Sequence, residues 1–190
     1  MGAGKGRSVA FRAQLDDFAA LYERTYPALF HTALGICGDA GLAADVTQDA
    51  YESAYRERAR FTGDVPVEAW LHRIAVNAAL SSLRRRRVRW TQPLDLERHD
   101  RAVSAADAAD AVAVRGALDH LEPRARAAVV LRYYHGFDYA TIAAILQTSP
   151  GNVGVLLSRA LDRLRLDLEA PVSRPAVATV PTAREADHGR

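Results

Sequence analysis

Apolar residues recur at helical spacing along most of the chain, and no alternation of apolar and polar residues is long enough for a β-strand. Helices are predicted over 13–34, 43–58, 67–87, 108–121, 123–134, 138–146 and 150–169. Pro27 predicts a kink or break in the first of these. In the helix over 123–134, the inward positions are expected to be Ala127, Val130, Leu131 and Tyr134. The pattern as a whole predicts an all-α protein.

The helical pattern is interrupted once, which predicts two small helical domains joined by a flexible linker. Between residues 88 and 106 the apolar periodicity fades into a polar stretch that contains Pro93. The tail from Pro171 has no periodicity and three prolines, so disorder is expected there. The predicted division is a first domain over 10–90, a linker over 91–107, a second domain over 108–170 and a tail over 171–190.

Composition excludes several classes of function. Cys37 is the only cysteine, so no intrachain disulfide can form, and the six scattered histidines form no metal-binding motif. No nucleophile motif is present, so we expect no enzyme, cofactor or metal site. No apolar run approaches the roughly 20 residues of a membrane span. A cytoplasmic protein without membrane insertion is expected.

Charge is divided unevenly, although the net charge is only +2. Residues 39–57 hold five acids and one arginine, whereas residues 71–90 hold six arginines and no acid. The chain therefore carries two opposite faces that suit different partners.

The arginine run Arg84 to Arg87 closes the third predicted helix. Successive helical residues are turned by about 100°, so these side chains surround the helix end rather than share one face. One or two cations would satisfy the helix dipole, at about 0.3–1 kcal/mol each. A solvated charge run remains the alternative, but a nucleic-acid backbone uses such a cluster better, because guanidinium groups match phosphate oxygens.

The acidic side chains of the second predicted helix form a stripe. Asp45, Gln48, Asp49 and Glu52 follow the spacing i, i+3, i+4, i+7 on the face opposite the buried alanines. A solvated face is the common explanation of such a stripe. Carboxylates repel phosphate, however, so beside a DNA-binding surface this face should point at a basic protein partner.

Two short helices near the C-terminus have the spacing of a helix-turn-helix, with residues 147–149 as the turn. Ser149 can cap the second helix, and Pro150 suits its first position. The outward residues are Asn152, Val155, Ser158, Arg159, Asp162 and Arg163. Such a helix can enter a major groove, and a plain helical hairpin is the alternative.

Several motifs together resemble one family. They are ADVTQDAY (44–51), WLHRIAVN (70–77) with the arginine run, LEPR (121–124), LRYYHGF (131–137), Ile142-Ala143 and the helix-turn-helix. The first two resemble region two, and the rest region four, of the extracytoplasmic-function (ECF) group of bacterial RNA polymerase sigma factors. The resemblance covers about residues 18–168.

The resemblance implies partners and roles for particular residues. Core RNA polymerase would be bound through its β subunit and through its β′ clamp helices, which would contact Asp45, Gln48, Asp49 and Glu52. The promoter's minus-ten element would be opened and read by Phe61, Thr62, Gly63, Asp64, Arg73, Asn77, Arg84, Arg85, Arg86 and Arg87. The minus-thirty-five element would be read by Arg124, Ser149, Pro150, Gly151, Asn152, Val155, Ser158, Arg159 and Arg163. An anti-sigma factor is a further expected partner.

The sequence departs from the family pattern at Ser81, Thr141, Gln147, Gly154 and Leu156. The last two stand where the recognition helix often has basic residues. Two other functions therefore stay open: a stand-alone helix-turn-helix regulator, and a polymerase-binding module that no longer reads the minus-thirty-five element.

Overall fold

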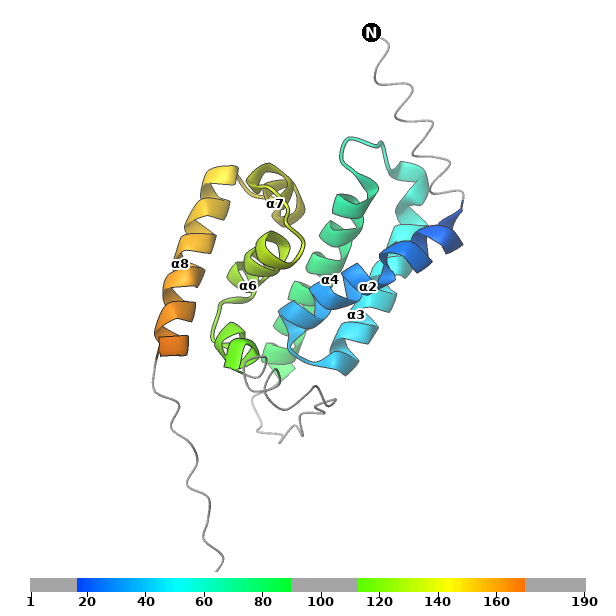
Figure 1. Ribbon diagram of the computed structural model, residues 1–190. Coiled ribbons are helices and arrows are strands. Elements are labelled where there is room, and N and C mark those ends of the chain that lie inside the picture. Colours follow the sequence, from blue (N-terminus) through cyan, green and yellow to red (C-terminus); the bar gives the residue numbers. More distant parts are fainter. Residues whose placement is uncertain (1–16, 90–112, 170–190) are drawn as a thin grey trace, which may run out of the picture.

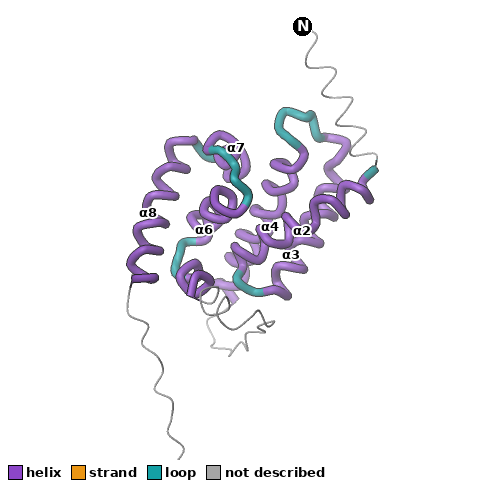
Figure 2. Tube along the Cα trace, viewed as in Figure 1, coloured by secondary structure: helices purple, strands orange, loops and turns teal. Residues whose placement is uncertain are grey.

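The computed structural model describes residues 17–89 and 113–169, which form helices joined by short loops (Figures 1 and 2). In chain order they are α2 (Phe18–Cys37), α3 (Ala40–Glu57), the 3₁₀ helix η1 (Arg58–Arg60), α4 (Val67–Arg89), a helix over 113–119, α6 (Pro123–Val129), the π-helical turn η2 (Val130–Tyr134), α7 (Tyr139–Leu146) and α8 (Pro150–Glu169). No strand occurs in these ranges, and the all-α prediction is confirmed. The predicted linker, the tail and the limits at 10 and 170 lie outside the described residues.

The described residues form a first half (17–89) and a second half (113–169). Capping residues set the helix ends in the first half. The Asp17 carboxylate accepts the Ala20 N–H at 3.0 Å at the start of α2, and Asp39 caps α3 in the same way at 2.7 Å. Between the two helices Gly38 adopts a φ of +71°, and its N–H donates to the Leu34 carbonyl at 2.8 Å. This left-handed turn folds α3 back onto α2.

Of the kink or break predicted at Pro27 the break is absent, and the prediction that Tyr134 points inward was wrong. Pro27 does not break α2. Proline has no N–H to donate to the carbonyl four residues earlier, but because Pro27 is exposed, that carbonyl can bond to water instead. Tyr134 is 60% exposed rather than inward. Here the His135 N–H donates to the Val130 carbonyl, an i to i+5 bond of 3.3 Å. In a π turn each residue is rotated about the helix axis by a smaller angle than in an α-helix. Tyr134, seven residues after Ala127, therefore no longer points to the buried side as Ala127 does.

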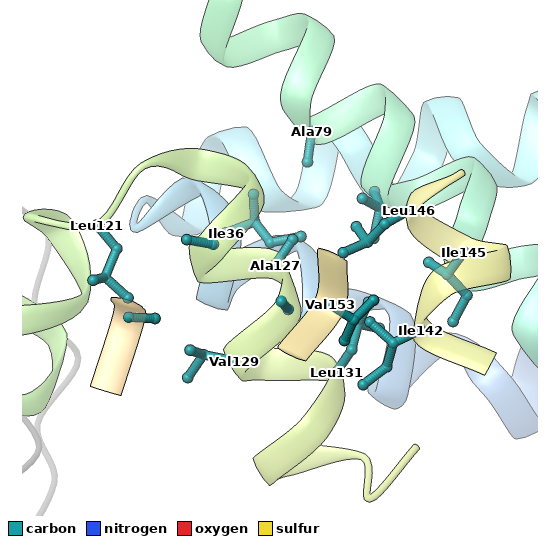
Figure 3. Close-up of a cluster of buried hydrophobic side chains, with 14 of the residues drawn as sticks. Ile36, Ala79, Leu121, Ala127, Val129, Leu131, Ile142, Ile145, Leu146 and Val153 are labelled. Carbon is teal, nitrogen blue, oxygen red and sulfur yellow. The ribbon is translucent and has the colours of Figure 1, made fainter. Parts of the chain in front are cut away.

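Apolar packing joins the two halves of the chain. One cluster lies within the first half and includes Leu21, Leu29, Ala50, Trp70 and Leu71. A larger cluster draws on both halves: Figure 3 shows Ile36 of α2 and Ala79 of α4 with the second-half residues Ala127, Leu131 and Ile142. The approach is tight at Gly35, where a Cβ would lie 2.7 Å from Val130 Cγ2.

Buried polar groups also cross between the halves. The Thr32 hydroxyl lies 3.0 Å from His72 Nδ1 and 2.7 Å from His135 Nε2, so one oxygen links α2, α4 and the residue after η2. Burial lowers the pKa of His72 to about 3 and that of His135 to about 4. Both imidazoles are therefore neutral near pH 7.

Arg126 of α6 forms a second polar link and is only 7% exposed. Its guanidinium donates to the Ile36 carbonyl of α2 at 2.9 Å, and within its own half to the Asp119 carboxylate at 3.1 Å. Burial lowers the pKa of Arg126, an effect that the Asp119 charge opposes. One buried cation thus holds the end of α2 against the second half.

Candidate nucleic-acid interface

The acidic stripe of α3 is exposed along its whole length, as predicted. Asp45, Gln48, Asp49 and Glu52 are all exposed, whereas the opposite face of α3 is buried through Ala43, Val46, Thr47, Ala50, Tyr51 and Ala54. Within the stripe, Gln48 Nε2 donates to Glu52 Oε1 at 3.2 Å. The stripe therefore presents carboxylates that no core contact requires.

Next to the stripe, α3 and α4 enclose a polar hollow of about 740 Å³. From α4 it is lined by Arg73, Asn77, Ser81 and Arg85, at successive intervals of four residues. Asp49 and Glu52 of the stripe line its other wall. The hollow therefore joins residues predicted for DNA melting to residues predicted for polymerase binding. It also has Gln147, a second-half residue, in its lining.

The loop over 61–64 adjoins this hollow. Phe61 stacks on Trp70, with ring centroids 4.6 Å apart and planes 28° apart, and Trp70 is a core residue. Gly63 adopts a φ of +78°, a conformation that favours glycine, and the Thr62 hydroxyl donates to the Asp64 carboxylate. A hollow of about 170 Å³ is lined by loop residues together with Trp70 and Arg73, which also line the larger hollow. The structure thus brings together the loop and α4 parts of the predicted minus-ten set.

The arginine run is helical to its end, because α4 continues to Arg89. Arg84, Arg85 and Arg87 are exposed and Arg86 is half-buried, so their side chains surround the helix as predicted. Burial raises the pKa of the Cys37 thiol at the end of α2 to about 12, and the charge of Arg86 opposes this rise. Only Arg85 of the run lines the α3–α4 hollow.

The helix-turn-helix has the predicted boundaries, and α8 begins at Pro150 with Ser149 Oγ accepting the Asn152 N–H at 3.2 Å. The break between α7 and α8 bends the chain by 95°. Gln147 forms the turn with a φ of +52°, the left-handed conformation that glycine would adopt more easily.

The predicted minus-thirty-five residues divide into two groups. On α8, Gly151, Asn152, Val155, Ser158, Arg159 and Arg163 are exposed, while Val153, Leu157 and Ala160 are buried. Arg124 lies apart on α6, where its guanidinium donates to the Leu146 carbonyl at the end of α7 at 2.6 Å. Arg124 therefore braces the turn, and the α8 face is the continuous surface.

Sequence reasoning missed the groups that join the halves. His72 and His135 belong to the scattered histidines without a metal-binding motif, and the structure shows both bonded to Thr32, a residue far from them in the chain. The sequence around Arg126, a helical segment rich in alanine, does not indicate that this side chain bonds to α2. Among the described residues no cluster of three His, Cys, Asp or Glu side chains is arranged to hold a metal ion.

In the described ranges no single helix is long and apolar enough to cross a membrane. The helices α7 and α8 meet that test only when taken together as a bent pair.

Comparison with known proteins identifies both halves. The sigma-70 region 2 family matches residues 21–89, and the sigma-70 region 4 family matches residues 111–164. The ECF RNA polymerase sigma factor SigL of Mycobacterium tuberculosis is 30% identical over 174 residues, which cover 88% of this chain and 94% of SigL. The chain therefore belongs to the ECF family of RNA polymerase sigma factors.

Two further likenesses agree with this family. The ECF sigma factor SigM of Mycobacterium tuberculosis is 40% identical over 122 residues, 64% of this chain. The matched part spans 62% of SigM and 53% of the related SigG, so the chain corresponds to about three fifths or less of those relatives. The sigma factor RpoE of Bartonella quintana, solved in complex with the anti-sigma factor NepR, superposes with a TM-score of 0.70 and 28% identity, covering 83% of this chain and 99% of RpoE.

Proposed function

We propose that this protein acts as a sigma subunit: it binds core RNA polymerase, directs it to particular promoters and helps to melt the DNA there, without making or breaking bonds. The observation that carries the proposal is the grouping of three exposed surfaces. They are the acidic stripe of α3, the hollow between α3 and α4, and the outer face of α8. A stand-alone DNA-binding regulator would leave the first two without a use.

The acidic stripe is the proposed polymerase contact, with the β′ clamp helices as its basic partner. Replacing Asp45, Asp49 and Glu52 by alanine should weaken assembly with core polymerase on the order of tenfold or more, because three complementary charges are removed. Competition with a labelled sigma factor measures this. Replacing the exposed acids Glu23 and Glu169 instead is the control, and equal affinity of the two variants would remove the assignment.

The hollow between α3 and α4 is the proposed site for the opened minus-ten strand. Melting captures unstacked bases, and guanidinium groups around the helix end hold the single-stranded backbone. Removing Arg84 to Arg87 should lower the slope of log affinity against log salt by about 0.7 for each single-strand phosphate that the variant no longer binds. An unchanged slope would show that this run does not contact phosphate.

The two promoter elements cannot both be reached from the packed arrangement. Elements about 25 base pairs apart are separated by roughly 85 Å along duplex DNA. A compact domain of this size has a radius of gyration of only about 14 Å. Reading both elements therefore requires the halves to separate, with residues 90–112 as their covalent connection.

An anti-sigma factor is a proposed partner, since the RpoE structure holds the anti-sigma factor NepR. An apolar groove of about 590 Å³ runs between the halves and is lined by Leu34, Val114, Leu118, Tyr133, Tyr134 and others. A partner helix seated there would hold the halves together and oppose their separation.

Transcription in vitro tests the proposed function. Core polymerase is assayed with and without the protein on a fragmented genomic library, and transcript 5′ ends are sequenced. Starts that require the protein and share spaced upstream motifs are expected. DNA binding without polymerase dependence would indicate the stand-alone regulator. Tight polymerase binding without new starts would indicate an interaction module.

A further inference from the structure

The first two turns of α8 expose few groups that can read a base edge. The exposed stripe runs through Gly151, Asn152, Val155, Ser158 and Arg159. Its first charged residue is Arg159, in the third turn. Glycine offers no side chain, and Ser149 at the cap precedes the helix and accepts the Asn152 N–H. The amide of Asn152 and the isopropyl group of Val155 are the side-chain groups that the first two turns of α8 itself present on this stripe.

The Asn152 amide is held in one orientation. Its Nδ2 donates to the Thr148 hydroxyl at 2.8 Å, a bond between the turn and the first turn of α8. This bond uses one of the two Nδ2 hydrogens and leaves the other, together with the Oδ1 acceptor. One donor beside one acceptor matches the N7 acceptor and N6 donor that adenine presents in the major groove.

Val155 lies one turn further along the same stripe and is 46% exposed. No core contact accounts for its outward position, because the buried side of α8 is formed by Val153, Leu157 and Ala160. On the major-groove edge of a base pair, the thymine C5-methyl is the apolar group that an aliphatic side chain can contact. Gly154 and Leu156, which flank Val155, supply no guanidinium that could read guanine instead.

The stripe is open in the described arrangement. Figure 1 shows α8 at the outer edge of the second half, with α6 and α7 between it and the first half. α8 packs on α6 and α7, so its outward face is available to DNA.

We propose that Asn152 and Val155 determine base specificity at the upstream promoter element: Asn152 binds an adenine through N6 and N7, and Val155 contacts a thymine methyl in the same or the next base pair. The element that this protein reads is therefore centred on A·T pairs. The inference rests on the proposed function and adds the bases read and the residues that read them.

Base analogues in the upstream element of a promoter found by the transcription assay test the inference, with the assembled holoenzyme as the binding protein. Replacing adenine by 7-deazaadenine removes the N7 acceptor, and replacing thymine by deoxyuridine removes only the methyl. At one adenine, 7-deazaadenine should weaken wild-type binding on the order of tenfold. At one thymine of the same or the next base pair, deoxyuridine should weaken it about three- to fourfold, the value of one buried methyl group.

The variants assign each effect to its residue. Asn152→Ala should lose sensitivity to 7-deazaadenine but keep that to deoxyuridine, and Val155→Ala should show the reverse. Thr148→Val, which removes the hydroxyl that orients the amide, should reduce the 7-deazaadenine effect. Leu168→Ala is the control, since Leu168 is 49% exposed and lies in the last turn of α8, 13 residues beyond Val155, and it should keep both sensitivities.

Two results would overturn the inference. Protein-dependent promoters whose upstream adenines and thymines tolerate both analogues would overturn it while leaving the proposed function intact, as would variants that keep full sensitivity. Absence of any protein-dependent start would instead overturn the proposed function, and the inference with it.

Discussion

The α4 surface and the α8 surface are both proposed to bind promoter DNA, yet the structure treats them differently. The α4 hollow has the second-half residue Gln147 in its lining, and α7 packs against α4. The outer face of α8 has no such neighbour in the described part of the chain (Figure 1). The second half thus restricts one DNA surface while it leaves its own surface open. If the α4 hollow binds the minus-ten strand as proposed, the contacts between the halves, rather than either surface alone, govern access to it.

The largest effect is expected from Arg126→Ala, which removes the buried cation that links α6 to the end of α2. The substitution leaves the Ile36 and Asp119 carbonyls without their donor and should lower the free energy of unfolding by about 3 kcal/mol. Urea denaturation measures this. Arg165→Ala is the control, because the ion pair of Arg165 with Asp162 is exposed, and it should change stability by less than about 0.5 kcal/mol.

A smaller effect is expected at Gly35, which packs tightly against the Val130 side chain of the other half. In Gly35→Ala the new Cβ would meet Val130, so the substitution should cost about 1–3 kcal/mol. Because the strain falls on the contact between the halves, the variant should also bind minus-ten single strands more tightly. In a Val130→Ala background the same substitution should cost close to nothing. If Gly35→Ala lowered the free energy of unfolding equally in both backgrounds, the cost would not come from a clash with Val130.

Acid should weaken the same contact through the two buried histidines. The pKa values of His72 and His135 are lowered to about 3 and 4, from an ordinary value of 6.5, so the unfolded chain takes up protons before the folded one does. Stability is therefore complete above about pH 6.5 and falls as the pH is lowered towards 4.

Unfolding free energies at pH 7 and pH 5 check this prediction. His135→Gln should flatten the dependence, whereas His120→Gln, at a largely exposed position, should preserve it. Equal stability at the two pH values would contradict the role given to this pair.

The smallest effect is expected at the turn that approaches the α4 hollow. Gln147→Gly relieves a left-handed φ of +52° and should raise the free energy of unfolding by up to about 1 kcal/mol. Thermal unfolding measures the change. A decrease in stability would mean that Gln147 side-chain contacts outweigh the backbone strain.

The elements that could be predicted from the sequence are those fixed by local chemistry. Ser149 and Pro150 define the start of α8, and the acidic stripe follows from the helical period of α3. Tyr134 was misplaced because nothing in its local pattern indicates a π turn. The contact between the halves was beyond reach, because Ile36 and Ala79 fit a helical pattern that does not specify which segment covers them.

The residues of the candidate site show the same limit. The exposed position of the α8 stripe follows from the helical spacing of the buried residues Val153, Leu157 and Ala160. The bond from Asn152 to Thr148 and the lining of the hollow by Gln147 depend on tertiary placement, and periodicity does not predict them.

The separation of the halves in an initiating complex tests the account most directly. Fluorescent labels are attached through Glu23→Cys in α2 and Arg165→Cys in α8, both at exposed positions, while the native Cys37 is buried with a pKa raised to about 12 and stays unlabelled. Energy transfer should report a distance under about 40 Å in the free protein. It should report roughly 60 Å or more once the holoenzyme initiates at a promoter. A short distance retained in an actively transcribing complex would contradict the account.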